Sequence, residues 1–130
     1  MDIKEKAVSY HDAGYNCAQS VLAALNEYTG LDEKTALAVS AGFGGGLRSG
    51  EVCGAISGAV MAIGMAFPFT DSSDAEAKDK IALLAKQCVA EGKEKFGCVR
   101  CCDLKGDKSA CPHYISDMTA IAEEMIKNNK

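Results

Sequence analysis

The seven cysteines are the residues of this chain best suited to chemistry. They occupy positions 17, 53, 88, 98, 101, 102 and 111 of 130 residues. A disulfide framework is typical of exported chains, whereas in a reducing compartment many cysteines indicate metal, cluster or redox chemistry. The number is odd, and the charged opening Met1-Asp-Ile-Lys-Glu-Lys6 predicts no signal peptide. We therefore expect a cytoplasmic protein whose thiols are functional.

Three of these cysteines are predicted to lie at the beginnings of helices. Cys17 follows Asn16, a good N-cap, Cys53 opens a helix of small residues, and Cys111 precedes a proline, which is favoured at the first helical position. Unpaired N–H groups and the helix dipole favour negative charge there, which lowers the pKa of a thiol and raises its thiolate fraction. If these termini converge, they would stabilise a thiolate site. Its fourth sulfur would come from the loop before Cys111, which carries cysteines 98, 101 and 102.

Simpler interpretations apply to other candidates. Cys88 lies in the middle of an apolar helical stripe and is predicted to be a small core residue. Cys98-Val-Arg-Cys101 is a CxxC without the βαβ context of thioredoxin and without a second pair at zinc-ribbon spacing. His11 and His113 are candidate proton carriers or ligands, although a partly exposed imidazole is the simpler expectation for both.

The elements that position these thiols are all expected to be helices. Apolar residues recur at helical spacing, and no stretch alternates as a strand does. The helices are predicted over residues 2–13, 16–28, 32–41, 53–66 and 75–95, and from 111 onwards. The pattern indicates an all-α fold in which residues 1–130 form a single domain, a compact bundle of about five to six helices with a Gly-rich loop.

The Gly-rich loop at residues 42–50 leads to Cys53. Its five glycines can adopt backbone angles closed to other residues. It lacks the Gly-Lys-Ser/Thr of a phosphate-binding loop, and no strand precedes it, so a nucleotide site is disfavoured. The helix that follows carries several small residues, including Gly54 and Gly58. These glycines predict either close helix packing or room for a cofactor, and the sequence leaves both open.

Composition and charge exclude some partners. The net charge is −4 and no basic stripe is present, so no nucleic-acid partner is expected. The uncharged run at residues 52–70 approaches the length of a membrane span. It is rich in Gly, Ala and Ser, however, which predicts a buried helix and no membrane span. A redox partner is expected but not identified, and a homodimer is left open.

The motifs together resemble the C_GCAxxG_C_C family, small proteins described as redox-active and named for their cysteines. The matching pieces are Tyr15-Asn-Cys17-Ala-Gln-Ser-Val-Leu22, Gly42-Phe-Gly-Gly-Gly46, Cys53-Gly-Ala-Ile-Ser-Gly58, Phe96-Gly97, Cys101, Leu104 and Cys111. The family pattern writes Gly-Cys-Ala where this chain has Cys53-Gly54-Ala55. The resemblance implies that Cys17, Cys53, Cys101 and Cys111 are the functional four, with Cys98 and Cys102 as neighbours able to replace Cys101.

Three functions are consistent with these four sulfurs. The leading hypothesis is an electron-transfer protein in which four thiolates hold an iron–sulfur cluster. The same set could hold a structural zinc and make the chain a binding module. Cofactor-free thiol–disulfide chemistry is the third hypothesis. The sequence shows no substrate pocket, so no enzyme class follows beyond an oxidoreductase or electron-transfer component.

Overall fold

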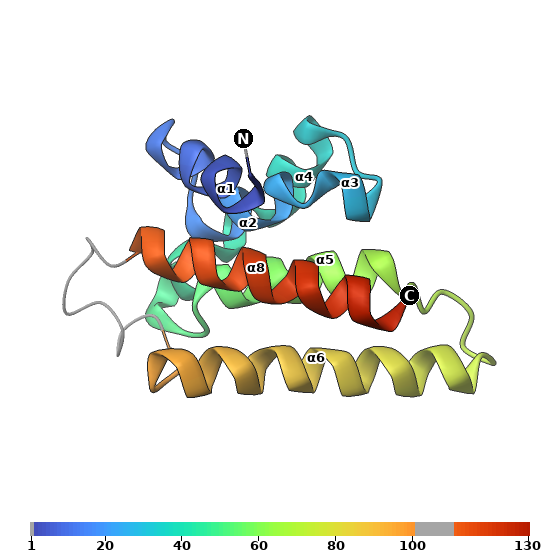
Figure 1. The fold of residues 1–130 in the computed structure, drawn as a ribbon. Coiled ribbons are helices and arrows are strands. Elements are labelled where there is room, and N and C mark those ends of the chain that lie inside the picture. Colours follow the sequence, from blue (N-terminus) through green and yellow to red (C-terminus); the bar gives the residue numbers. More distant parts are fainter. Residues whose placement is uncertain (1, 101–110) are drawn as a thin grey trace.

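Helices form almost all the regular structure of the computed structural model, which describes residues 2–100 and 111–130 (Figure 1). These residues contain no strand, only an isolated antiparallel bridge between Val52 and Arg100. The all-α prediction is confirmed. The helices are α1 (Ile3–Asp12), α2 (Cys17–Ala24), α3 (Asn26–Thr29), α4 (Glu33–Ser40), α5 (Gly54–Ala66), α6 (Ala75–Phe96) and α8 (Cys111–Asn129).

The described residues hold seven helices, one more than the upper predicted count. The sequence predicted one helix over residues 16–28, and the structure divides it at Leu25, where φ is −91° and ψ is 18°. The single turn α3 follows and ends at Gly30, which takes a left-handed φ of 73°. The apolar spacing continues through the break, so periodicity alone gave no sign of it.

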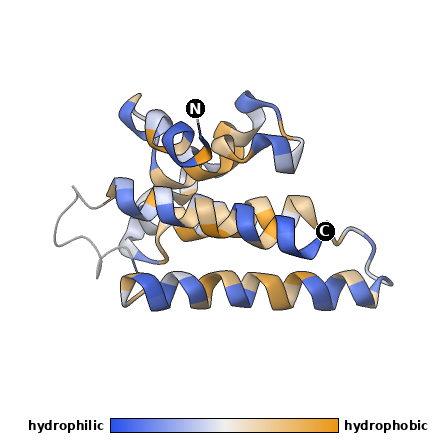
Figure 2. Cartoon of the chain, in the orientation of Figure 1, coloured by the Kyte–Doolittle hydropathy of each residue, from blue (hydrophilic) through white to orange (hydrophobic). Residues whose placement is uncertain are grey.

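Helix α5 is the centre of the bundle and contacts α2, α6 and α8. It carries no charged residue, and most of its side chains are buried, including Ile56 and Ile63, which are fully buried. Figure 2 shows it as an apolar ribbon between helices that carry hydrophilic residues. The uncharged run is therefore a core helix, as predicted. No helix in the described part of the chain is both long and apolar enough to cross a membrane.

Two glycines of α5 face the beginning of α2. A Cβ added to Gly54 would lie 3.1 Å from the backbone nitrogen of Ala18, and one added to Gly58 would lie 2.8 Å from the carbonyl oxygen of Ala18. A methyl group at either position would press against the backbone of α2. These glycines therefore serve close helix packing, one of the two uses that the sequence left open.

The segment between α4 and α5 forms an ordered turn of unusual handedness. Residues 45 to 48 all have positive φ, with values of 64°, 65°, 61° and 59°. Glycine accepts this conformation freely, but Leu47 and Arg48 do not, at a cost of about 1–2 kcal/mol per residue. The backbone N–H of Glu51 donates to the carbonyl of Gly46 at 2.9 Å and closes the turn. The Gly-rich loop thus holds a defined left-handed shape just before Cys53.

Candidate thiol site

Three cysteines of the predicted set lie at helix N-termini, as expected. Cys17 is the first residue of α2, Cys53 is the N-cap of α5, and Cys111 is the first residue of α8. Helices α5 and α8 begin at the same end of the bundle, where α6 ends (Figure 1). A helix N-terminus favours the thiolate because its first N–H groups have no intrahelical acceptor. The three cysteines therefore share the helix N-terminal setting that the sequence predicted.

Cys17 and Cys53 are brought together by the glycine contact between α2 and α5. Gly54, the residue after Cys53, packs on Ala18, the residue after Cys17. Cys53 is 4% exposed, and Cys17 is partly buried. The first turns of two helices thus meet, with one thiol on each.

Asn16 and Gln19 fix the beginning of α2. The side-chain oxygen of Asn16 accepts from the Gln19 N–H at 3.0 Å, and that of Gln19 accepts from the Asn16 N–H at 3.1 Å, which forms a capping box. Each amide also uses its NH₂ group. Asn16 Nδ2 donates to the carbonyl of Ala41 at 2.9 Å, and Gln19 Nε2 donates to that of Leu37 at 3.0 Å. The turn that carries Cys17 is therefore tied to the end of α4.

A second tie joins Cys53 to the chain that follows α6. The backbone N–H of Cys53 donates to the carbonyl of Val99 at 2.7 Å, next to the bridge between Val52 and Arg100. Arg100 Nε also lies 3.8 Å from a carboxylate oxygen of Glu51. The residue before Cys101 is therefore held beside the residue before Cys53.

Two members of the predicted sulfur set lie outside the described residues. Cys101, the expected fourth ligand, and its neighbour Cys102 fall in the undescribed range 101–110. Cys98 and Cys111 are described, and both are partly buried. Within residues 2–100 and 111–130, no group of three or more His, Cys, Asp or Glu side chains is placed to hold a metal ion. Among the described residues, Cys17 and Cys53 are the cysteines whose neighbours Ala18 and Gly54 are in contact, and no ready set of three ligands accompanies them.

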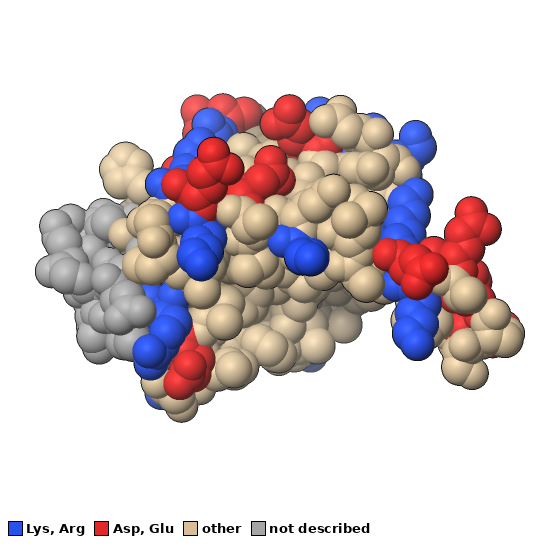
Figure 3. Space-filling view, turned by 90° about the horizontal axis from the view of Figure 1, so that it is seen from below, with Lys and Arg blue, Asp and Glu red and all other residues tan. Residues whose placement is uncertain are grey.

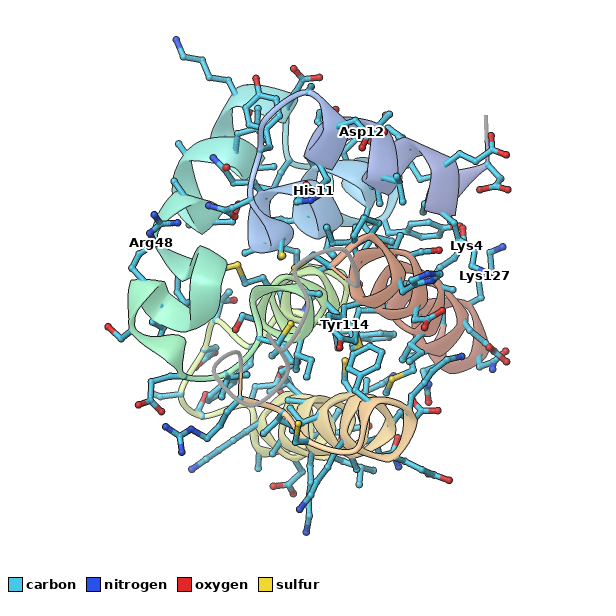
Figure 4. All side chains as sticks on the ribbon, turned by 90° about the vertical axis from the view of Figure 1, so that its left-hand side faces the viewer. Lys4, His11, Asp12, Arg48, Tyr114 and Lys127 are labelled. Carbon is cyan, nitrogen blue, oxygen red and sulfur yellow. The ribbon has the colours of Figure 1, made fainter. Side chains whose placement is uncertain are left out.

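Aromatic and imidazole side chains lie at the same end of the bundle. The rings of Phe96 and Tyr114 contact each other at a tilt of 57°, with centroids 4.6 Å apart, where α6 ends and α8 begins. Figure 4 shows the molecule from this end, with Tyr114 near the centre of the view, His11 above it and Arg48 at the left edge of the molecule. His11 is partly buried, with Nδ1 3.2 Å from the Tyr15 carbonyl oxygen, whereas His113 is exposed. His11 therefore lies beside the segment that leads to Cys17.

Cys88 has a different environment from the thiols at the helix N-termini. It is fully buried in the middle of α6, and burial, with a smaller contribution from Glu91, raises its pKa from 9.0 to about 12. Such a thiol stays protonated at neutral pH. The prediction that Cys88 is a core residue is confirmed.

Sequence reasoning missed the second role of Asn16 and Gln19. The Asn-x-x-Gln spacing is a capping-box signal and could have been recognised. The hydrogen bonds to α4 could not, because their acceptors are backbone carbonyls more than a dozen residues away. The bridge between Val52 and Arg100 had no sequence signal, since one residue pair cannot produce alternation.

The described residues form a small all-α bundle in which the first turns of α2 and α5, each with a cysteine, lie against each other. The comparisons agree: a family model described as "Putative redox-active protein (C_GCAxxG_C_C)" matches residues 15–125. The chain belongs to this family. No curated protein and no solved structure matches it.

Proposed function

We propose that the chain carries out redox chemistry through the thiols of Cys17 and Cys53. The observation that supports this is the packing of Gly54 on Ala18, which sets the two cysteines on adjoining helix N-termini. Membership of a family described as redox-active agrees with it. Thiols in such positions are favoured as thiolates, the form that attacks a disulfide.

The reaction that follows is thiol–disulfide exchange. The thiolate of one cysteine attacks a disulfide of the oxidised partner, which releases one partner thiolate and leaves a mixed disulfide. The second cysteine, as its thiolate, then attacks the sulfur of the first cysteine in the mixed disulfide and displaces the other partner thiolate. The chain ends with a Cys17–Cys53 disulfide, two protons are released from its thiols, and the partner is reduced by two electrons.

An iron–sulfur cluster for electron transfer is the second proposal. Thiolates are the usual ligands of such clusters, and Cys17, Cys53 and Cys111 all lie at helix N-termini, which suit an anionic group. The described residues do not supply three grouped ligands, so this proposal depends on Cys101 as well as on Cys111. When bound, the cluster would supply one-electron redox chemistry. A structural zinc on the same sulfurs remains the alternative without redox activity.

Purification without oxygen, followed by metal analysis and a redox titration, tests these proposals. A metal-free protein in which Cys17 and Cys53 form a disulfide reversibly against glutathione supports the dithiol. Iron and sulfide with broad visible absorption support the cluster and overturn the dithiol. Stoichiometric zinc whose cysteine ligands resist oxidation overturns both the dithiol and the cluster proposals.

A further inference from the structure

We propose that Asn16 and Gln19 are positioning residues that hold Cys17 in place relative to the segment leading to Cys53. This inference rests on the proposed redox role of the thiol pair. A capping box needs only one side-chain oxygen from each residue. In this chain each side chain makes a second hydrogen bond, and both of these run to α4 rather than within α2.

The choice of amides at these two positions follows from the second set of bonds. Serine would cap α2 about as well as Asn16, and glutamate would complete the box as well as Gln19. Neither side chain could both cap the helix and donate to a distant carbonyl in the same way. Only the NH₂ groups of Asn16 and Gln19 supply those donors.

The acceptors lie where α4 ends and the Gly-rich loop begins. The last carbonyls of a helix have no intrahelical donor, and Asn16 satisfies that of Ala41. Asn16 also packs directly against Gly44, where an added Cβ would overlap the Asn16 side chain. Asn16 therefore directly precedes Cys17 and also contacts the Gly-rich loop that leads to Cys53.

Together these contacts act as a clamp across the thiol pair. Gly54 and Ala18 bring the two helices together, and Asn16 and Gln19 fix the incoming loop against the first turn of α2. Misplacement of reacting groups by about 1 Å can lower a rate by roughly 100-fold. The separation of the two sulfurs is therefore the property that the clamp controls.

The variant Asn16→Ser tests the clamp, with Asp74→Ser as its matched control. Both replace an Asx N-cap by serine, but Asp74 caps α6, where its carboxylate accepts from the Ala77 N–H at 3.0 Å. The readout is the rate at which the Cys17–Cys53 disulfide forms in oxidised glutathione, measured by mass spectrometry of peptides. We expect a rate about tenfold to 100-fold lower for Asn16→Ser and an unchanged rate for Asp74→Ser.

The outcomes separate the clamp from the redox role. A wild-type protein whose two thiols never form a disulfide overturns the proposed dithiol function itself. A disulfide that forms in the wild type and forms at the same rate in Asn16→Ser overturns the clamp alone. If Asn16→Ser does not fold, Gln19→Met gives a second test, because it removes the bond to Leu37 and the reciprocal bond from the Asn16 N–H while the Asn16 oxygen still caps α2.

Discussion

Cys53 and Cys88 are both buried, yet they lie at different positions along their helices. Cys53 is 4% exposed and Cys88 is fully buried, so burial alone does not separate them. The difference is their place along a helix. Cys88 lies mid-helix among core side chains, and burial raises its pKa to about 12. Cys53 is the N-cap of α5, and the first N–H groups of a helix have no intrahelical acceptor.

The comparison shows that a cysteine count does not distinguish core thiols from thiols at helix termini. The α6 helix uses its thiol as a small apolar group in the core, whereas α2 and α5 carry theirs where their first turns adjoin. Four changes would break or sharpen this contrast.

The largest effect is expected from Cys53→Ser. It removes one member of the thiol pair, and we expect complete loss of reversible disulfide formation with Cys17. The matched variant Cys88→Ser should retain that activity, although a buried hydroxyl in place of a thiol lowers stability. Titration against glutathione measures both, and an active Cys53→Ser protein would contradict the assignment of the pair.

A large effect on stability is expected from Gly58→Ala. The added methyl would lie 2.8 Å from the backbone oxygen of Ala18, so α5 must move away from α2. We expect a loss of about 1–3 kcal/mol in the free energy of unfolding.

The matched control is Gly64→Ala in the same helix, where an added Cβ meets nothing within 4 Å. Alanine should stabilise the helix there by about 0.8–1 kcal/mol. Urea denaturation measures both variants. Equal effects of the two substitutions would show that the contact between α2 and α5 is not close.

A pH-dependent effect is expected from Cys88. Its pKa is raised in the folded protein from 9.0 to about 12, so folding favours the protonated thiol. That stabilisation is complete below about pH 9 and is lost as the pH rises towards 12.

The free energy of unfolding should therefore fall more steeply between pH 9 and 11 in the wild type than in Cys88→Ala. Tyr10 and Tyr28, whose pKa values are also raised to about 12, contribute equally to both proteins. Parallel curves for the two proteins would contradict the buried, protonated state of Cys88.

The smallest effect is expected from Arg100→Ala. The guanidinium lies 3.8 Å from Glu51, and both side chains are about half exposed, at 52% and 56%. Such exposed pairs contribute about 0.2–1 kcal/mol. Stability by urea denaturation should change within that range, because the backbone bond between Cys53 and Val99 persists. A larger loss would mean that the side chain, rather than the backbone, holds this segment beside Cys53.

Seen from below, the molecule shows charged side chains beside a broad uncharged area (Figure 3). Leu83 of α6 is 55% exposed, so an apolar residue on this helix need not belong to the core. Helical periodicity identifies a stripe, but it does not state how completely neighbouring helices cover it.

The sequence by itself determined the helices and the local setting of the thiols. Apolar spacing, the cap at Asn16 and the proline after Cys111 are local signals, and the structure has helices beginning at Cys17 and at Cys111. They depend on residues within one or two turns. This locality is the reason why the all-α class and three helix N-terminal cysteines could be predicted.

Only the tertiary structure decided which of the helix N-termini that carry cysteines lie against each other. Three contacts join residues that are far apart in the sequence. They are the packing of Gly54 on Ala18, the hydrogen bond from the Asn16 side chain to the carbonyl of Ala41, and the bridge between Val52 and Arg100. The left-handed turn at Leu47 and Arg48 was equally unpredictable, because its residues oppose it. Such contacts depend on how whole helices pack, and the glycines of α5 by themselves do not specify which helix they contact.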